Sequence, residues 1–267
     1  MFHENLLRKK LLEGSPTLST RLHSMSPLIA EAVGALHQYD YIEFVGEYAP
    51  YDQYGMENLV RAAEVHGMAS MMKADFHNRA YVAQKSIASG FQAVLFTDHT
   101  TPEQIEESIK CITPMCPQKN GTMGYAARRW IEFQNVKTQD EYIDMVCQTV
   151  KAFMVEKKSV VDDLDSFLSV PGIDMVQFGP NDYALSAGIN MADHKDLIKN
   201  VEKKVILACH DHGIRPHVEL NSAADAEFYL DLGVKDFSLG LEMRILQGFL
   251  EKEGDLLMDM LAKNNIL

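Results

Sequence analysis

The chain has 267 residues, and 46% of them are apolar, which allows one large α/β domain with a substantial core. Acidic residues outnumber basic ones by 38 to 25, so the net charge at pH 7 is −13. A surface this negative argues against nucleic acid or an anionic membrane as a partner, although local groups can still hold a small anionic substrate.

The start of the chain, 1–14, predicts a charged amphipathic helix and lacks the apolar stretch of a secretory signal. No apolar run approaches the roughly 20 residues of a membrane span. The spacing of Cys111 and Cys116, without a second pair, is weak support for a zinc site. The other two cysteines, Cys147 and Cys209, are isolated. We expect a soluble cytoplasmic protein with four reduced thiols.

Strand-like segments alternate with amphipathic helices along the chain, and several of the helices end at a Gly, which supplies a left-handed C-cap. The expected strands lie in 17–23, 37–46, 66–73, 89–99, 150–156, 170–179, 212–220 and 232–240. Such alternation is typical of parallel βα units, and eight of them in this length predict a single (β/α)8 TIM barrel over residues 1–267. A doubly wound open sheet is the alternative, but the Gly-rich phosphate turn usual near its first strand is missing.

Helix starts carry capping signals that agree with this alternation. Thr101 precedes Pro102 and Gln104, which is the pattern of a capping box with Pro at the first helical position. Two further pairs, Thr138 with Glu141 and Ser222 with Asp225, repeat the cap-plus-acid arrangement.

Two other stretches bear on the site. The stretch 114–134 is not followed by a strand at the expected distance, and we expect it to be a long βα excursion over the C-terminal face of the barrel, where substrate-covering residues usually lie. The last helical stretch, 242–261, carries many Leu and Met residues, and we expect it to pack on a neighbouring subunit as well as on its own barrel.

Two carboxylates follow two apolar strands. The run 153–155 ends in Glu156, and the run 175–178 leads through a tight turn to Asp182. The segment 159–170 between them predicts a helix, so the two strands are parallel and both acids emerge at the same edge. Two hard oxygen ligands at a barrel mouth are what a divalent cation needs. The alternative is that each acid caps the helix that follows it.

Several motifs together resemble the HpcH/HpaI family of metal-dependent pyruvate aldolases, of the 4-hydroxy-2-oxoheptanedioate aldolase type. They are the sequence GEYAP at 46–50, the segment 124–130, the strand end 153–156 and the stretch 170–188, which contains PGID and GPNDYALSAG. The resemblance implies a TIM barrel whose last helix is exchanged between subunits of a homohexamer, a trimer of dimers. It also implies cleavage of a 4-hydroxy-2-oxo acid into pyruvate and an aldehyde.

By this resemblance Glu156 and Asp182 hold the metal, Mg²⁺ or Mn²⁺, with Co²⁺ or Zn²⁺ as alternatives. Backbone N–H groups near Asn181 and Asp182, in the turn that begins with Gly179 and Pro180, would bind the carboxylate of the 2-oxo acid. The cation would stabilise the enolate oxygen that forms as the carbon–carbon bond breaks.

The chain departs from the family pattern in the groups that move protons. Tyr48 stands where the family has His, and Lys73 stands where it has a catalytic Arg. Ala88 falls at the place of the acid that supports the His, and Met154 replaces a Gln. Lys keeps a positive charge but cannot form the planar, bidentate hydrogen bonds of Arg. Tyr has a free pKa of ~10 and is therefore a poor base. The substrate therefore need not be the usual one.

Each replacement has alternatives. Lys73 polarises the carbonyl oxygen, or is a Schiff-base nucleophile, or is a rim lysine whose stem lies on apolar surface. Glu47 holds a metal-bound water or orients Lys73, or forms only a surface salt bridge. Tyr48 donates a hydrogen bond to the substrate or fills space, while His77 and His99 are replacements for the missing base or ordinary rim residues.

Charged groups farther along the chain are also candidates. Arg128 and Arg129 would reach an anionic substrate tail or lie in solvent. His217 and Glu219 look like a site pair, but the resemblance places no ligand there, and we assign them no role.

The sequence thus predicts a divalent-metal-dependent carbon–carbon lyase acting on a 2-oxo acid. Two alternatives stay open. One is related enolate chemistry, a condensation or decarboxylation, on a different 2-oxo acid or a citrate-like acid. The other is a non-catalytic barrel that binds a 2-oxo acid.

Overall fold

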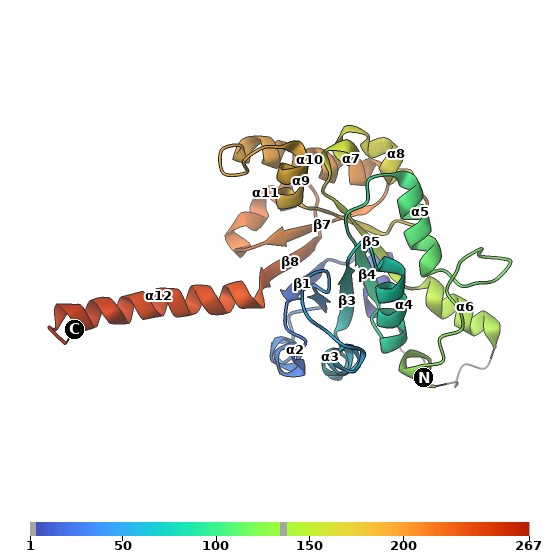
Figure 1. Cartoon of the computed structure of the whole chain (residues 1–267), viewed down its shortest axis with the longest axis horizontal. Helices are drawn as coiled ribbons and strands as arrows, with labels where there is room; N and C mark the ends of the chain where they lie inside the picture. The colour runs from blue at the N-terminus through green and yellow to red at the C-terminus, as the bar shows by residue number, and fades with distance from the viewer. Residues whose placement is uncertain (1–3, 134–137, 267) are drawn as a thin grey trace.

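The computed structural model describes residues 4–133 and 138–266. Eight parallel strands form a closed barrel in the order β1 to β8 (Figure 1). They are β1 (Thr17–Leu22), β2 (Tyr41–Phe44), β3 (Ala69–Ala74), β4 (Ala93–Phe96), β5 (Val150–Val155), β6 (Met175–Phe178), β7 (Arg215–Leu220) and β8 (Asp236–Leu241). The predicted TIM barrel is confirmed, and every strand lies within one residue of its predicted segment.

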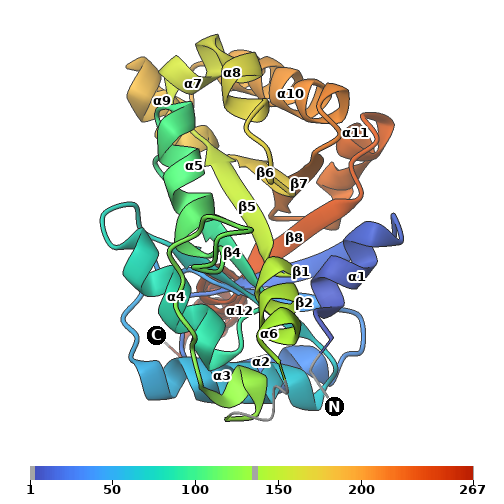
Figure 2. The same ribbon diagram turned by 90° about the vertical axis from the view of Figure 1, so that its right-hand side faces the viewer.

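Helices surround the barrel, and the last one extends away from it (Figures 1 and 2). They are α1 (Leu6–Leu12), α2 (Pro27–Gly34), α3 (Gln53–Val65), α4 (Arg79–Ser89), α5 (Pro102–Cys111), η1 (Arg129–Ile131), α6 (Gln139–Cys147), α7 (Lys158–Asp162), α8 (Leu164–Leu168), α9 (Pro180–Ala187), α10 (Lys195–Asp211), η2 (Ala223–Asp225), α11 (Ala226–Asp231) and α12 (Glu242–Lys263). None of the helices in the described ranges combines the length and the apolar character needed to cross a membrane.

Alternate positions along each strand face opposite sides of the sheet, and this alternation divides the core into two parts. Outward side chains such as Phe44 and Phe96 join the large apolar cluster beneath the helices. Inward side chains, including Tyr41, Met71 and Met154, form a separate smaller cluster inside the barrel. Position along a strand therefore tells which residues can reach the barrel mouth.

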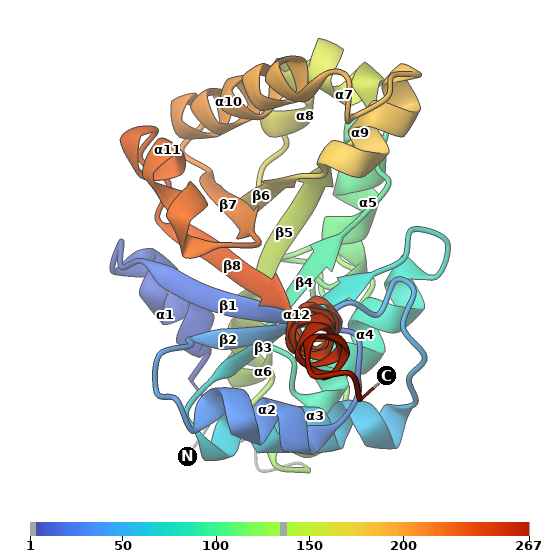
Figure 3. The same ribbon diagram turned by 90° about the vertical axis from the view of Figure 1, so that its left-hand side faces the viewer.

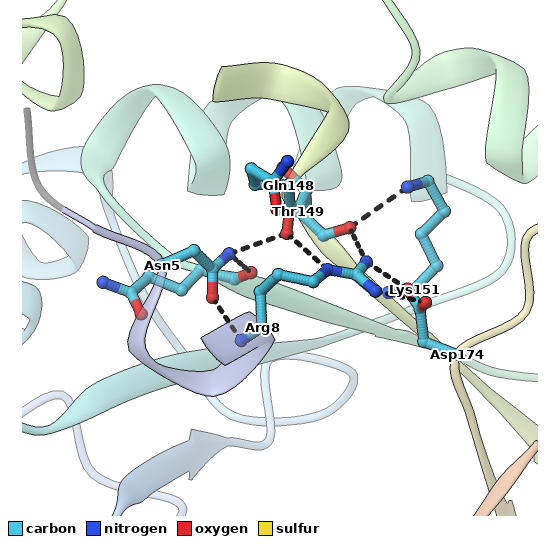
Figure 4. Close-up of polar contacts among 7 residues, drawn as sticks. Asn5, Arg8, Gln148, Thr149, Lys151 and Asp174 are labelled. Carbon is cyan, nitrogen blue, oxygen red and sulfur yellow. Dashed lines mark hydrogen bonds and ion pairs between the residues drawn. The ribbon is translucent and has the colours of Figure 1, made fainter. Parts of the chain in front are cut away.

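Helix α1 covers the N-terminal end of the barrel. Its Leu7 packs with the interior cluster. The Arg8 guanidinium donates to both Asp174 carboxylate oxygens, at 2.5 and 2.6 Å, and to the Thr149 carbonyl at 3.1 Å (Figure 4). Asn5 accepts a hydrogen bond from the Arg8 N–H and caps the helix. With this end covered, the strand ends at the opposite face are where a substrate can enter. The first three residues of the predicted helix, 1–3, lie outside the described part of the chain.

The expected position of the stretch 114–134 is wrong. Helix α5 has already returned the chain to the N-terminal end of the barrel. This stretch therefore follows a helix, contains η1 and precedes α6, and it does not connect a strand to a helix. Accordingly, Arg129 forms an ion pair with Glu64 and donates to the Ser89 carbonyl, at the C-terminal ends of α3 and α4. The last residue of the stretch, Gln134, lies outside the described ranges.

The helix expected over 159–170 is present as two short ones, α7 and α8. Asp163, between them, has φ −129° and ψ 56°, which is not helical.

The capping boxes at Thr101 and Thr138 are confirmed. Ser222 caps only the single 3₁₀ turn η2. The four cysteines are free thiols, as expected.

Candidate active site

A pocket of about 540 Å³ opens at the C-terminal end of the barrel. It is lined by the ends of most of the strands and by the first turn of α9. The lining side chains that matter most below are Arg21, Glu43, Lys73, Met154, Asp182 and Glu219. Another cavity, of about 560 Å³, lies beside α1 at the opposite end, and neither of the two strand-end acids lines it.

Glu156 is buried directly against the turn that precedes α9. One of its carboxylate oxygens accepts a hydrogen bond from the Asp98 N–H at 2.6 Å. A Cβ atom built on Gly179 would lie 2.8 Å from the other oxygen, Oε2, and 2.9 Å from the Met154 Cε. These contacts are too close for any side chain, so position 179 must be glycine for the carboxylate to approach this turn.

Asp98 is a site residue that the sequence analysis missed. Its φ is 60°, a left-handed conformation that is uncommon outside glycine and often found at functional sites. Its carboxylate forms an ion pair with Lys157. Burial lowers the pKa of Lys157, but the carboxylates of Asp98, Glu156 and Asp182 together raise it above its usual value. Three acids thus act on one ammonium group, which links Glu156 and Asp182 electrostatically.

The two predicted metal ligands have the character that a divalent cation requires. Burial raises the pKa of Glu156 to about 7, so this carboxylate lacks a full counter-charge in the protein alone. Asp182 is half-buried in the first turn of α9 and lines the pocket. Over residues 4–133 and 138–266, no group of three or more His, Cys, Asp or Glu side chains is spaced to hold a metal ion. A cation here would therefore take two acidic side chains from this chain and its remaining ligands from elsewhere.

The start of α9 provides donors for an anion beside these acids. Pro180 is the first helical residue and has no N–H, while the N–H groups of Asn181 and Asp182 lie in the first turn, where no intrahelical acceptor is available. Gly179 to Asp182 all line the pocket. The turn that the sequence analysis predicts to bind a carboxylate is thus at the pocket, and carboxylate binding stays a prediction.

Lys73 enters the pocket from β3 and forms an ion pair with Glu47, with 2.9 Å between Nζ and Oε2. Both side chains are largely buried. Burial by itself lowers the pKa of Lys73, but the carboxylates of Glu47, Glu219 and Glu43 outweigh it and raise the pKa above its usual value. Lys73 is thus a charged donor oriented by Glu47, and its charge argues against a Schiff-base nucleophile, which must be neutral.

Tyr48 lies at the rim with 75% of its surface exposed. Partial burial, the charge of Glu47 and a hydrogen bond to that carboxylate raise the pKa of the phenol to about 12. A group with so high a pKa is a poor base near neutral pH.

The two histidines proposed as replacement bases do not line this pocket. His77 is exposed and lies beside a groove on α4 and α5. His99 is fully buried outside the barrel wall, where its ring lies 2.7 Å from the Ser108 hydroxyl and packs edge-on against Phe153. Burial lowers its pKa to about 4, so the ring is neutral. Neither side chain was distinguishable from a mouth residue by its distance from a strand end alone.

Arg128 is also placed away from the pocket. Its guanidinium pairs with Glu57 on α3, because the connection that carries it runs along the outside of the barrel. Within one subunit the structure does not bring Arg128 together with the other candidate site residues.

The structure adds charged residues from inside the barrel. Arg21, Glu43 and Glu219 all line the pocket, and Arg21 donates to Glu219. Glu219 was set aside in the sequence analysis, and Arg21 and Glu43 were not singled out. A charged side chain at an inward position of a strand could have identified them from the sequence. Glu43, for example, lies two residues after Tyr41 and therefore on the same face of the strand.

Comparisons with known proteins bear on the family and the fold. The family model described as HpcH/HpaI aldolase/citrate lyase matches residues 22–246. A 2-keto-3-deoxy-L-rhamnonate aldolase of Klebsiella pneumoniae is 26% identical over 204 residues, which cover 75% of this chain and 74% of that protein. A hydroxypyruvate/pyruvate aldolase of Roseobacter denitrificans is 23% identical over 244 residues, 91% of this chain and 93% of that one. The crystal structure of an HpcH/HpaI aldolase from Desulfitobacterium hafniense has the same fold, with a TM-score of 0.83 at 23% identity over 94% of this chain and 96% of that one.

Proposed function

Because the chain belongs to the HpcH/HpaI aldolase/citrate lyase family and is a carbon–carbon lyase, we propose that it cleaves or forms a 4-hydroxy-2-oxo acid by way of a pyruvate enolate. The observation that carries this proposal is a pair of acids, one lining the pocket and one buried against its Gly179 turn. Glu156 is buried beneath Gly179, and Asp182 begins the helix that follows.

Glu156 and Asp182 are the residues that would hold a divalent metal ion, Mg²⁺ or Mn²⁺ in the first place and Co²⁺ or Zn²⁺ as alternatives. When bound, such an ion supplies Lewis-acid stabilisation of the negative charge that develops on the 2-oxo oxygen. Two carboxylates, one of them buried without a full counter-charge, are a donor set suited to a hard cation.

The protein groups around this position orient the substrate. The N–H groups of Asn181 and Asp182 bind the substrate carboxylate, aided by the positive end of the helix dipole. The Lys73 ammonium donates to the oxygen on which charge develops. Glu47 is a positioning residue, since its ion pair fixes where that ammonium lies. Together these groups favour the enolate over the intact substrate.

Assembly into a homo-oligomer is part of the proposal. Helix α12 projects from the barrel, and Figure 3 shows it end-on in front of the strands. None of its 22 residues is buried in the single chain. Its exposed apolar side chains include Ile245, Leu246, Phe249, Leu250, Leu256, Leu257, Met258 and Met260. An apolar surface of this extent is typical of a protein–protein contact, and a second copy of the chain is the partner we propose.

The proposal is tested by exchange of the pyruvate methyl protons in D₂O with Mg²⁺ or Mn²⁺ present. The wild-type protein should catalyse exchange, because an enolate forms reversibly. Glu156→Gln and Asp182→Asn should reduce it at least ~100-fold. Asp162→Asn, which removes an exposed acid paired with Lys158 on α7, is the matched control and should exchange at the wild-type rate. A wild-type protein that catalyses neither exchange nor carbon–carbon cleavage would support the non-catalytic alternative.

A further inference from the structure

Five side chains from alternate inward positions of the strands form a polar group inside the upper barrel, which we call the interior charge cluster. Its members are Arg21 on β1, Glu43 on β2, Lys73 on β3, Gln177 on β6 and Glu219 on β7. Barrel interiors are normally filled by layers of apolar side chains, each layer drawn from alternate strands. Charged residues in these layers cost free energy unless they are paired.

Glu219 is fully engaged within the cluster. Its Oε1 accepts a hydrogen bond from the Gln177 amide, and its Oε2 accepts one from the Arg21 guanidinium. Both Glu219 oxygens are therefore already held by hydrogen bonds within the cluster.

Glu43 is in the opposite situation. It is 0% exposed and lines the pocket, yet neither of its carboxylate oxygens has a hydrogen-bond partner among the described residues. Its neighbour in register on β1 is Arg21, and on β3 it is Met71. A buried carboxylate that makes no hydrogen bond is strongly disfavoured, so Glu43 either holds a proton or gains a partner from the contents of the pocket.

The charges around Glu43 lead to the same conclusion. Burial is the largest cause that raises the pKa of its carboxyl, to about 7, and the Glu219 carboxylate acts in the same direction. The cations Arg21 and Lys73 lower the pKa, and Glu47 raises it. Three acids thus face two cations, and a pKa near neutrality lets Glu43 both hold and release a proton.

Three other groups in or beside the pocket are less suited to exchange a proton with the substrate. Tyr48 is exposed and has a raised pKa. Glu47 is held by Lys73, and Glu202 accepts a hydrogen bond from the Tyr229 hydroxyl at 2.9 Å. Among the described residues, Glu43 is the buried acid whose two oxygens both lack a hydrogen-bond partner.

We propose that Glu43 is the acid–base catalytic residue of this pocket. In cleavage, the Glu43 carboxylate takes the proton of the 4-hydroxyl, the C3–C4 bond breaks, the aldehyde C=O forms, and the bonding pair becomes the enolate of pyruvate. The Glu43 carboxylic acid then returns the same proton to C3, which makes the methyl group of pyruvate and regenerates the carboxylate. The proposal rests on the proposed lyase function and assigns the proton transfer that Tyr48, in place of a histidine, does not provide.

The test uses two reactions that differ in their need for a base. Exchange of the pyruvate methyl protons in D₂O requires a base at C3. Release of CO₂ from oxaloacetate needs none, because the C–C bond electrons pass into the enolate as CO₂ leaves. Both are measured with Mn²⁺ present, for the wild type, Glu43→Gln, Glu43→Asp and the control Glu57→Gln, whose carboxylate pairs with Arg61 and Arg128 outside the pocket.

We expect Glu43→Gln to reduce methyl exchange ~100-fold or more while oxaloacetate decarboxylation stays within about threefold of the wild type. Glu43→Asp should restore part of the exchange, because it keeps the carboxyl group. The exchange rate of the wild type should rise with pH between about 6 and 8, and Glu43→Gln should lose this rise. Thermal unfolding of each variant checks that the fold is intact.

Three results would overturn the proposal. If Glu43→Gln exchanges the methyl protons at the wild-type rate, another group is the base, and the proposed lyase function is unaffected. Equal losses of exchange and decarboxylation would show that Glu43 only supports the structure of the site. A wild-type protein that catalyses neither reaction would overturn the lyase function and the role of Glu43 together.

Discussion

The Lys73 ammonium lies 2.9 Å from the Glu47 carboxylate, and both side chains are shielded from solvent at the pocket wall. In such a place burial alone would favour a neutral amine, as in lysines that attack carbonyl groups. The acids around Lys73 reverse that tendency and keep it protonated. The pair therefore provides a fixed positive charge and not a nucleophile.

This relationship predicts that no Schiff base forms. Incubation with pyruvate and sodium borohydride should leave the intact mass of the protein unchanged, because a protonated lysine does not add to the carbonyl. Lys73→Met should lower methyl exchange by roughly 100-fold through loss of the charge at the oxygen. A mass increase that corresponds to reduced pyruvate on Lys73 would contradict this account.

A second prediction concerns the close approach of Gly179 to Glu156. In Gly179→Ala the added Cβ would meet Glu156 at 2.8 Å, so the carboxylate must move away from the turn. We expect the affinity for Mn²⁺, measured by titration calorimetry, to fall by about tenfold to 100-fold. Gly124→Ala, where nothing lies within 4 Å of the new atom, is the control and should bind Mn²⁺ as the wild type does. Unchanged affinity in Gly179→Ala would show that Glu156 does not bind metal at this turn.

The pH dependence of stability offers a third prediction. The pKa of Glu43 is about 7 in the folded protein, above its usual value of 4.5. As the pH rises from 4.5 to 7, the unfolded chain releases this proton while the folded chain keeps it, so the fold loses stability over this interval. Glu43→Gln removes this dependence, and its free energy of unfolding should increase relative to the wild type between pH 4.5 and 7.

Glu57 is the control for this prediction, because its effect on stability changes with pH in the opposite direction. Burial raises the pKa of Glu57, but Arg128 and Arg61 outweigh it and lower the pKa below its usual value. The stability that Glu57 contributes is therefore present above pH 4.5 and is lost as the pH falls. Glu57→Gln should be most destabilising at neutral pH and least at low pH. Urea titrations at several pH values measure both variants, and parallel pH profiles for the two would refute the assignment of Glu43.

A fourth prediction concerns α12. If its apolar side chains pack on another copy of the chain, Phe249→Glu should disrupt that contact, since a buried unpaired charge costs several kcal/mol. Light scattering coupled to size-exclusion chromatography should show the wild type as an oligomer and the variant as a smaller species. Lys252→Glu, on the same helix with 79% of its side chain exposed, changes the net charge by even more and is the control, which should leave the mass unchanged. A monomeric wild type would remove α12 as an assembly element.

Most of the fold could be predicted from the sequence because its signals are local. Gly residues after helices, capping boxes and runs of bulky apolar residues each act within a few positions, and eight repetitions leave a barrel as the simplest arrangement. The same local signals placed Glu156 and Asp182 after neighbouring strands. Their common edge followed from the parallel direction of those strands.

The parts that were missed depend on contacts between distant residues. Whether His99 enters the mouth or lies behind the barrel wall depends on the direction of its side chain, and its distance from the strand does not show this. The position of Arg128 depends on which end of the barrel the preceding helix reaches. The left-handed backbone of Asp98 is held by tertiary contacts, and Glu43 became a candidate only once its oxygens were found without partners.

The central claim is that Glu156 and Asp182 coordinate the same cation at the barrel mouth. A crystal soaked with Mn²⁺ and pyruvate tests this claim most directly. The account predicts an anomalous peak between the two carboxylates, with metal–oxygen distances of roughly 2.0–2.3 Å and the 2-oxo acid bound to the same ion. No peak at that position, or two carboxylates turned away from each other, would contradict it.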